Sequence, residues 1–344
     1  MKKKKNSLMA LLVVALIALG TVFHFYQKVM KKNVLKESVV YIPTDCSTEQ
    51  LANLLTPILK STEDFIWVAE KKKYLNNIKA GKYQLRKDMN SNELVNLLRS
   101  GKQTAIRLTF NNQHNLKSLA GRIGQQIEAD SIALLEAFTN PAFLKQHNFN
   151  TATALGMYIP NSYEVYWNTS ATQFRAKMLK EYKRFWNKTR LSKAKDQKLT
   201  PKQVIALASI VQKETAHIKE RPVVAGLYLN RFHHNWPLQA DPTVIFALKA
   251  KNGEDFEVKR VLNKDLKIES PYNTYKYKGI PPGPIAMPDI SSINAVLNPT
   301  KHNYYYMCAS VENLGTHAFA STLRQHNKNA VKYQKWLSNQ GVNR

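Results

Sequence analysis

The stretch from residue 200 to 248 decides how we expect the chain to fold, and it reads TPKQVIALASIVQKETAHIKERPVVAGLYLNRFHHNWPLQADPTVIFAL. Thr200 has a side chain that can cap a helix, Pro201 suits the first helical position, and Gln203 completes a capping box. An apolar periodicity follows at once. The pattern therefore predicts a helix that runs from about Pro201 towards Thr215.

Glu214 ends the apolar face of this predicted helix. At 100° per residue it falls on the same side as Leu207, Ile210 and Val211, so its carboxyl is expected to point inward. Apolar surroundings disfavour the charged form of a carboxyl, which raises its pKa and suits a general acid. The alternative at this point is an ordinary helix-end carboxylate that pairs with a nearby basic residue such as Lys213.

Composition limits the class of protein. The 344 residues leave room for one large domain or two modest ones, and 51 Lys and Arg against 24 Asp and Glu give a net charge of +27. This charge favours anionic partners, namely nucleic acid, phospholipid headgroups or an acidic wall polymer. The two cysteines, Cys46 and Cys308, form no disulfide framework; two unpaired buried thiols are expected, and a single bridge between them is the alternative.

The N-terminus predicts a membrane anchor. Lysines at positions 2–5 precede an apolar, uncharged run from Leu8 to Tyr26, and about 20 such residues span a bilayer as a helix. The run continues past the poor cleavage site at residues 18–20, which favours an uncleaved signal anchor over a signal peptide. The lysine distribution favours a cytoplasmic N-terminus with the body outside. A buried helix of a soluble protein is the alternative.

Residues 38–110 have the pattern of a small module. Strands are expected at residues 39–42 and 105–110, and capping boxes at Ser47 and Asn90 predict two helices of similar sequence, STEQLANLL and NSNELVNLL. This suggests two related strand-then-helix units, unless two amphipathic helices look alike by chance. With the short span GKYQL before its second helix, the module is similar to a LysM-like wall-binding domain.

The region from residue 111 to 198 is expected to be a helical connection. Helical periodicity dominates from Asn115 to Thr189, and a proline turn with several aromatic residues interrupts it between residues 157 and 174. Those aromatic side chains can stack on sugars, although they more often form core. The lysines at positions 193–198 are expected in a solvated linker.

Several motifs after Glu214 carry a resemblance to a known family. The segment 270–288, SPYNTYKYKGIPPGPIAMP, is rich in turn residues and predicts a fixed, irregular loop of the kind that lines sites. In order, five segments resemble the YceG-like endolytic murein transglycosylase family, often called MltG: LASIVQKET, LYLNRF, LQADPTVIFAL, YNTYKYKGIPPGPIAMP, and GTHAF with the later HN. The match is specific over roughly residues 155–335 and looser over the module and the anchor.

The resemblance implies a membrane-anchored enzyme of the bacterial inner membrane, with its body on the periplasmic or extracytoplasmic side. Such an enzyme cleaves nascent peptidoglycan glycan strands between MurNAc and GlcNAc without water, leaves a 1,6-anhydro-MurNAc end and so terminates glycan elongation. It needs no cofactor and does not bind nucleic acid, and peptidoglycan synthases are expected partners. The implied architecture is α+β, with a tail (1–7), a transmembrane anchor (8–26), a LysM-like module (38–110), a helical connecting region (111–198) and a mixed α/β catalytic domain (199–344).

The resemblance also assigns site residues. The one catalytic glutamate of the family matches Glu214, and Gln212, where many relatives have an acid, cannot transfer a proton in this role. Relatives generally have an acidic residue directly before the glycine that corresponds to Gly156, whereas this chain has Leu155 there. Any role of that acid in substrate contact is therefore in doubt for this chain. Candidates for binding sugar or orienting the glutamate, each of which could instead hold a turn or cap, are Asn230, Gln239, Asp241, Thr243, Tyr272, Asn273 and Tyr275.

Other chemistries find less support in the sequence. The histidines show no HExxH or comparable ligand spacing, and there is no P-loop, GxGxxG or GxSxG motif. If the reaction were hydrolysis, a second carboxylate would be needed, and Asp241, Glu220 or Glu164 would be its candidates. The remaining alternatives are a non-catalytic, membrane-anchored wall-binding or scaffold protein and a membrane-tethered nucleic-acid binder.

Overall fold

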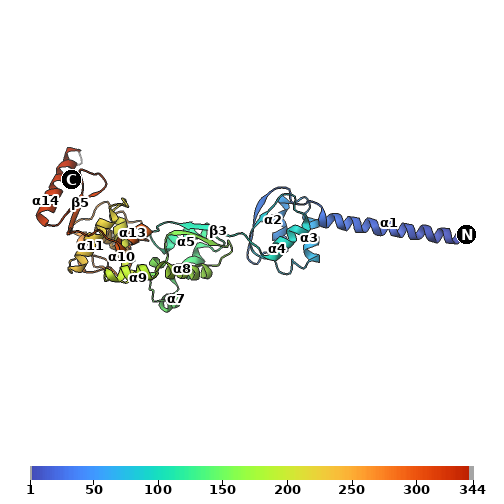
Figure 1. The fold of residues 1–344 in the computed structure, drawn as a ribbon, viewed down its shortest axis with the longest axis horizontal. Coiled ribbons are helices and arrows are strands. Elements are labelled where there is room, and N and C mark those ends of the chain that lie inside the picture. Colours follow the sequence, from blue (N-terminus) through green and yellow to red (C-terminus); the bar gives the residue numbers. More distant parts are fainter. Residues whose placement is uncertain (1, 341–344) are drawn as a thin grey trace. The chain divides into compact units, whose positions relative to one another are not determined.

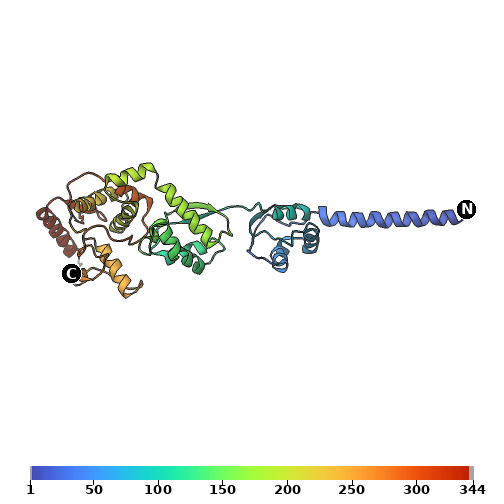
Figure 2. The same ribbon diagram turned by 90° about the horizontal axis from the view of Figure 1, so that it is seen from below.

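A computed structural model describes residues 2–340 and divides the chain into two compact units (Figures 1 and 2). The first unit holds the chain up to Leu108 together with two short returns, Gln126–Ala129 and Tyr163–Ser170. The second holds Thr109–Gln125, Asp130–Ser162 and the chain from Ala171 onward. Residue 1 of the predicted tail and residues 341–344 of the predicted catalytic domain lie outside the described residues.

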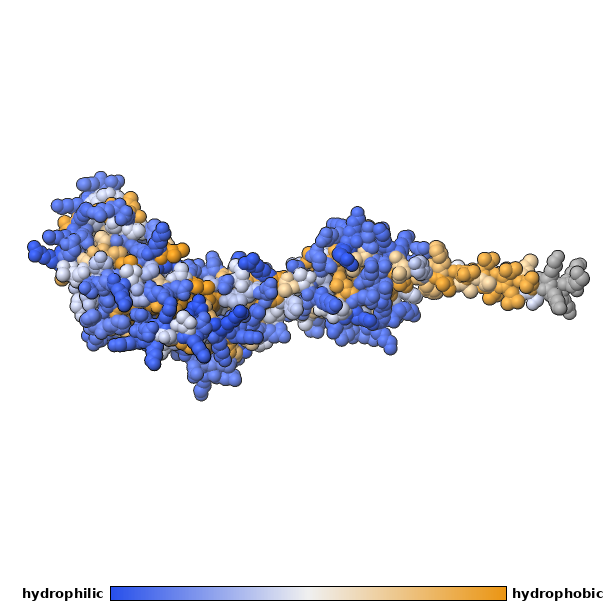
Figure 3. All heavy atoms as spheres, viewed as in Figure 1, coloured by the Kyte–Doolittle hydropathy of each residue, from blue (hydrophilic) through white to orange (hydrophobic). Residues whose placement is uncertain are grey.

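The first helix, α1 (Lys2–Met30), is the apolar helix that the sequence predicts at the N-terminus. Its segment Ser7–Met30 is long and apolar enough to cross a membrane, by length and composition. The large apolar side chains between Leu8 and Tyr26 are exposed, and Figure 3 shows an apolar surface along the face of the helix that is in view. In a soluble protein such a surface would have to be buried, so the exposed helix fits the predicted anchor.

The first unit is built from two antiparallel strands and short helices around one core. Both predicted capping boxes form, at Ser47 and at Asn90, because each side chain accepts the backbone N–H three residues on. Strand β1 pairs with β2 from Ser38 opposite Leu85 to Ile42 opposite Gly81. The elements are β1 (Ser38–Ile42), α2 (Thr48–Leu55), η1 (Thr56–Ile58), α3 (Thr62–Lys71), β2 (Gly81–Leu85) and α4 (Ser91–Ser100).

Strand β3 (Ile106–Phe110) pairs with β4 (Asn161–Val165) in a second two-stranded sheet. Helices then dominate, as predicted from the periodicity of this region: α5 (Leu116–Gly124), α6 (Ser131–Thr139), α7 (Pro141–Gln146), η2 (Ala154–Met157), α8 (Ala171–Phe185) and α9 (Lys188–Asp196). Mixed helices and small sheets agree with the α+β class at this coarse level.

The lysine-rich segment before Thr200 is not the solvated linker that we expected. Residues 188–196 form α9, because Asn187 caps its start by accepting the N–H of Arg190. The guanidinium of Arg190 lies 4.1 Å from the ring centre of Phe185, and Ala194 is buried. A capped start, a buried alanine and packing against neighbouring elements therefore accompany a helix where the lysines predict a loop.

Helix α10 (Pro201–Glu214) is the centre of the second unit and has the predicted bounds. The capping box of Thr200 and Gln203 forms at its start, and every residue from Val204 to Val211 is buried. It packs against α11 (Arg221–His233) and α13 (Ile290–Leu297), which lie beside it in Figure 1. The remaining elements are α12 (Asp241–Asn252), η3 (Asp265–Lys267), β5 (Tyr306–Ala309), β6 (His317–Ala320) and α14 (Leu323–Asn339).

Two features near the C-terminus complete the surroundings of α10. Strands β5 and β6 form an antiparallel hairpin, with Tyr306 opposite Ala320 and Ala309 opposite His317. Residues 270–288 form a succession of turns, as the sequence predicts for this segment. The hairpin and the turns reach the same end of α10, where Glu214 lies.

Candidate active site

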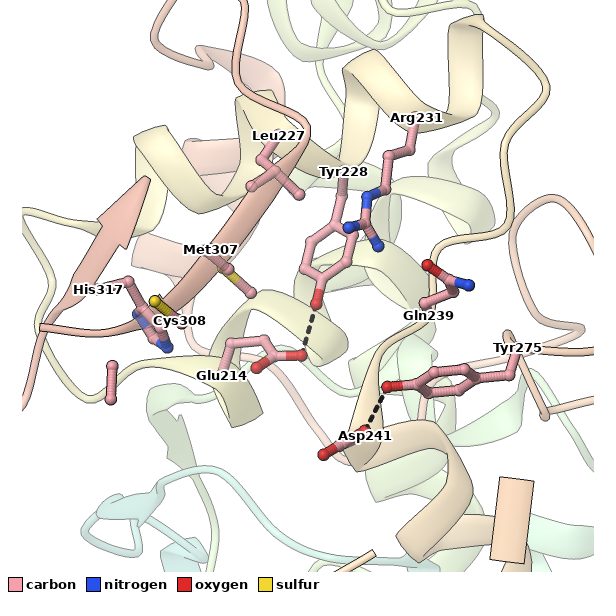
Figure 4. Close-up of a pocket in the computed structure, with 11 residues that line it drawn as sticks. Glu214, Leu227, Tyr228, Arg231, Gln239, Asp241, Tyr275, Met307, Cys308 and His317 are labelled. Carbon is pink, nitrogen blue, oxygen red and sulfur yellow. Dashed lines mark hydrogen bonds between the residues drawn. The ribbon is translucent and has the colours of Figure 1, made fainter. Parts of the chain in front are cut away.

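A polar pocket of about 210 Å³ lies at the C-terminal end of α10 (Figure 4). The surrounding side chains come from α10, α11, the start of α12, the turn segment and the β5–β6 hairpin. The lining residues are Glu214, Leu227, Tyr228, Arg231, Gln239, Asp241, Tyr275, Met307, Cys308, Ala309 and His317.

Glu214 is the last residue of α10, and its carboxyl points into the pocket. The helix ends here because Thr215 takes up an extended conformation, with φ −139° and ψ 133°. The hydroxyl of Thr215 then accepts the backbone N–H of His217 at 3.1 Å and fixes the turn that follows. The buried body of α10 thus holds a carboxyl at the edge of an apolar core, as the periodicity predicts.

Tyr228 holds one oxygen of this carboxyl. Its hydroxyl donates a hydrogen bond of 2.5 Å to Oε1 of Glu214, from a ring that is buried on α11 (Figure 4). Burial raises the pKa of Tyr228 well above its ordinary value, so the phenol keeps its proton and remains a donor. Oε1 of Glu214 is therefore engaged before any ligand arrives.

The pKa of Glu214 is raised to about 7, chiefly because burial disfavours the carboxylate. The hydrogen bond from Tyr228 stabilises the carboxylate and lowers this pKa, while the negative charge of Asp241 raises it and the positive charge of Arg231 lowers it. The net result is a carboxyl that can hold or release a proton near neutral pH. This is the property required of a group that acts first as an acid and then as a base.

Arg231 brings a buried positive charge to the pocket. It follows Tyr228 by three residues on α11, so both side chains lie on the same helix face. Nε of Arg231 donates to the carbonyl of Tyr305 at 2.7 Å and Nη1 to that of Leu238 at 2.5 Å. Neutral carbonyls thus hold the guanidinium, and its positive charge acts on Glu214 in the pocket.

Three of the predicted binding residues come together in the pocket. The hydroxyl of Tyr275 donates to Oδ1 of Asp241 at 2.5 Å, which joins the turn segment to the first residue of α12 (Figure 4). Gln239 stands just before α12 in a left-handed conformation, φ 51°, and its N–H donates to the carbonyl of Thr274 at 3.0 Å. Gln239, Asp241 and Tyr275 therefore present polar groups opposite Glu214.

The other four predicted binding residues do not line the pocket. Asn230 donates to the carbonyls of His302 and Tyr304, at 2.8 and 3.0 Å. Asn273 is fully buried and donates to the carbonyls of Leu266 and Ile268, both at 2.9 Å. Both side chains hold the backbone of loops that border the site, which is the turn-holding role weighed for them from the sequence.

Thr243 and Tyr272 also lie behind the pocket. The buried hydroxyl of Thr243 donates to the carbonyl of Ala240 at 2.7 Å and lies 2.8 Å from the hydroxyl of Thr274. The ring of Tyr272 packs on Phe246, with ring centres 4.5 Å apart. These contacts fix α12 against the turn segment and so position the residues that do line the site.

A second acid–base pair borders the pocket. Glu220 directly precedes α11, and its carboxylate accepts two hydrogen bonds from His317, from the backbone N–H at 2.6 Å and from Nδ1 at 3.1 Å. His317 itself lines the pocket from β6. Of the carboxylates considered for hydrolysis, Glu220 is thus paired with a histidine, Asp241 with a tyrosine, and Glu164 is an exposed residue of β4.

Sequence reasoning did not place Tyr228 or Arg231 in the site. A signal was present, because LYLNRF sets a tyrosine and an arginine three residues apart on an otherwise apolar helix, and a buried arginine requires partners. The hairpin residues Met307, Cys308 and Ala309 offered no comparable signal, since only the fold brings β5 to the end of α10. Both cysteines are free, with Cys46 buried and Cys308 partly exposed.

Gln212 lies away from the pocket and joins two helices. Its Nε2 donates to Oδ2 of Asp289 at 3.0 Å, and its Oε1 accepts from the backbone N–H of Asp289 and the hydroxyl of Ser292, at 3.2 and 2.6 Å. These bonds tie α10 to the start of α13. Leu155 is buried in η2, so it belongs to the core of its unit.

Comparisons with known proteins agree with one another on the family. A model of the YceG-like family matches residues 40–332. The chain is similar to the endolytic murein transglycosylase of Bacillus subtilis strain 168, at 30% identity over 311 residues that cover 86% of this chain and 84% of that protein. It is 26% identical to the endolytic murein transglycosylase of Streptococcus pneumoniae serotype 2 strain D39, in a match that covers 94% of this chain and 64% of that protein.

A solved structure has the same fold over most of its length. This crystal structure, of a protein described as yceG-like from Listeria monocytogenes, matches with a TM-score of 0.56 and 28% identity, and covers 85% of this chain and 98% of that chain. The residues matched by the family model include every residue that lines the pocket.

Proposed function

The chain belongs to the YceG-like family, and from this premise we propose that it is an endolytic peptidoglycan lytic transglycosylase with Glu214 as its acid and base. Its substrate is a murein glycan strand, cut between MurNAc and GlcNAc. One observation carries the proposal: a carboxyl with a pKa of about 7 points into a polar pocket, where Tyr228 orients it.

The reaction needs one carboxyl in two states. Protonated Glu214 gives its proton to the glycosidic oxygen as the bond from C1 of MurNAc to that oxygen breaks, and positive charge develops on the sugar ring. The resulting carboxylate then takes the proton of the C6 hydroxyl while O6 of the same sugar bonds to C1. A 1,6-anhydro-MurNAc end results, and Glu214 is protonated again for the next cut.

The other pocket residues support these steps. Tyr228 engages Oε1 of Glu214, so Oε2 is the oxygen that would face the glycosidic bond. The carboxylate of Asp241, held by Tyr275, supplies negative charge near the positive sugar ring. Arg231 stabilises the glutamate after it has given up its proton. In the resting site the charges of Asp241 and Arg231 shift the pKa of Glu214 in opposite directions, and burial remains the main cause of its raised value.

A product analysis tests this proposal. Purified wild-type chain and Glu214→Gln are incubated with peptidoglycan, and the released muropeptides are analysed by mass spectrometry. We expect anhydro-ended fragments from the wild type and none from Glu214→Gln, because an amide cannot transfer the proton. Glu136→Gln, which changes an exposed glutamate of α6, serves as the matched control and should cleave normally.

Two other outcomes of this experiment would contradict the proposal. Cleavage by Glu214→Gln at the wild-type rate would remove Glu214 from the mechanism. A wild-type chain that retains glycan but releases no anhydro ends would favour the alternative of a non-catalytic wall-binding scaffold.

We further propose that α1 anchors the chain in the bacterial inner membrane, with the N-terminus in the cytoplasm and the pocket on the extracytoplasmic side. The exposed apolar surface of α1 supports the anchor, and a wall substrate requires this orientation. Reporter fusions to the C-terminus test it: a periplasmic reporter should be active, whereas an active cytoplasmic reporter would favour the nucleic-acid binder. Residues 38–110 would then act as a LysM-like wall-binding module, and peptidoglycan synthases are the partners that would supply the nascent strand.

A further inference from the structure

An exposed cluster of aromatic rings adjoins the catalytic pocket. Just after helix α11, Asn235 takes up a left-handed conformation, φ 56°, and the N–H of Trp236 donates to the carbonyl of Arg231 at 2.8 Å. This turn places the ring of Trp236 at 5.0 Å from Tyr305 and 6.2 Å from Tyr306, measured between ring centres. We refer to these three residues as the Trp236 cluster.

The Trp236 cluster is open to solvent although it contains large rings. Trp236 is 42% exposed, and Tyr305 and Tyr306 are partly exposed. A single exposed apolar side chain needs no explanation, but three adjacent rings on one surface are typical of a binding site. The rings are also held in place, because Tyr306 stacks on His326 and the hydroxyl of Tyr305 lies 3.2 Å from Nδ1 of His234.

Arg231 connects this cluster to the pocket. Its Nε donates to the carbonyl of Tyr305, and its guanidinium carbon lies 5.8 Å from the ring centre of Tyr306. The same side chain lines the pocket together with Met307, which directly follows Tyr306 on β5. The cluster thus directly adjoins the site that holds Glu214.

The volume of the pocket shows why the substrate must reach beyond it. At about 210 Å³ it is smaller than the range of about 300–1,000 Å³ that encloses a whole small-molecule ligand. A glycan strand is a polymer, so the sugars next to the cleaved bond have to lie on the surface outside. The C–H faces of a pyranose ring are apolar, and they pack on exposed aromatic rings with the hydroxyl groups left in water.

We infer that the Trp236 cluster is a binding platform for a sugar of the glycan strand adjacent to the cleaved bond. This inference rests on the proposed function and adds a subsite to it. Trp236 contacts substrate outside the pocket, so it contributes to binding and leaves the proton transfer by Glu214 unchanged.

The experiment measures binding and turnover separately, with the full chain in detergent. Binding of peptide-free glycan strands is titrated with Glu214→Gln and with the same chain carrying Trp236→Ala in addition. Cleavage of the same strands is followed for Trp236→Ala and Trp236→Phe in the otherwise wild-type chain. Trp336→Ala is the matched control, because Trp336 stacks on Tyr333 of α14 and does not line the pocket.

We expect Trp236→Ala to weaken binding and to raise KM about two- to tenfold, with kcat and the pH profile unchanged. Trp236→Phe should restore most of the loss, since it keeps a ring, and Trp336→Ala should behave as the wild type. Unchanged binding and KM in Trp236→Ala, or an equal loss in Trp336→Ala, would overturn the inference. If the wild type bound glycan through Trp236 but released no anhydro ends, the platform would stand and the proposed function would fail.

Discussion

The two oxygens of Glu214 have different surroundings, and this difference sets how the site is expected to respond to pH. Oε1 accepts a hydrogen bond from the hydroxyl of Tyr228, which favours the carboxylate, whereas burial favours the protonated acid. Burial is the larger effect, so the pKa of Glu214 is about 7. Activity that depends on the protonated form of the free enzyme should therefore fall as the pH rises through about 7.

Replacing the hydrogen-bond donor should move this pH dependence. Tyr228→Phe removes a bond that stabilises the carboxylate, so the pKa of Glu214 should rise further, by about one unit if a charged hydrogen bond contributes about 1.5 kcal/mol. The alkaline limb of kcat/KM against pH should shift upward by the same amount. Tyr277→Phe, at an exposed tyrosine of the turn segment, is the control. An unshifted limb would mean that Tyr228 does not tune Glu214.

The same carboxyl should make stability depend on pH. Its pKa rises from 4.5 in the unfolded chain to about 7 in the folded chain, so the folded state holds the proton more tightly. The stabilisation is fully present below pH 4.5 and is lost as the pH rises through 7, by up to about 3 kcal/mol. Glu214→Gln should escape this loss, whereas Glu136→Gln should follow the wild type.

Chemical denaturation at pH 4.5 and at pH 8 measures this effect. We expect the difference in free energy of unfolding, Glu214→Gln minus wild type, to be larger at pH 8 than at pH 4.5. Equal differences at the two pH values would show that the carboxyl is not destabilised by burial.

At the scale of elements, α10 is held from three directions. Its start is capped by Thr200, its middle is surrounded by the core of the second unit, and its last turn is tied to α13 through Gln212. Arg221, nearly buried at the start of α11, reaches the same α13 start, with Nη1 at 2.6 Å from the hydroxyl of Ser291. The position of Glu214 therefore depends on contacts between helices as well as on the helix that carries it.

Removing the link from Gln212 should affect stability and leave the chemistry unchanged. Gln212→Ala leaves the backbone N–H of Asp289 and the hydroxyl of Ser292 without their acceptor, at a cost of about 1–3 kcal/mol. Thermal unfolding should begin at a lower temperature, while anhydro-ended products and the pH profile persist. Gln334→Ala, an exposed position of α14, should leave the melting temperature unaltered. A changed pH profile in Gln212→Ala would place Gln212 in the catalytic machinery.

At the scale of the whole molecule, charge and the apolar helix offer two different ways of reaching a membrane. A chain with a net charge of +27 can adhere to anionic surfaces, and that adhesion is screened by salt. Insertion of α1 depends on apolar burial and is insensitive to salt. The two can be separated in one fractionation experiment.

The full chain should stay in the membrane fraction after a wash with 1 M salt. This concentration is on the order of tenfold above the ionic strength at which surface charges are already screened. A chain without residues 2–21 should move to the soluble fraction, and it keeps the contact between Phe25 and Trp67, whose ring centres lie 5.2 Å apart. Release of the full chain by salt alone would assign membrane binding to charge and would exclude α1 as the anchor.

The structural features that the sequence predicts correctly depend on residues close together along the chain. The bounds of α10, the capping boxes, the apolar helix α1 and the inward direction of Glu214 all follow from residues within one or two helical turns of each other. The sequence pattern yields no prediction for α3 and predicts a linker at α9. Both helices nevertheless have a local start signal, because Ser61 accepts the N–H of Asp64 and Asn187 that of Arg190. Motif order carried the family, since it needs no knowledge of contacts.

Which side chains come together in the pocket depends on the tertiary structure. Tyr228, Arg231 and His317 line the same pocket as Glu214 but come from other elements of the fold, which only the packing of these elements brings together. For the same reason Asn230, Thr243, Tyr272 and Asn273 match the motifs and yet bond to backbone and core behind the pocket. The pKa of Glu214 depends on its burial, on the hydrogen bond from Tyr228 and on the opposing charges of Asp241 and Arg231. These surroundings exist only once the helices, the turn segment and the hairpin are packed together.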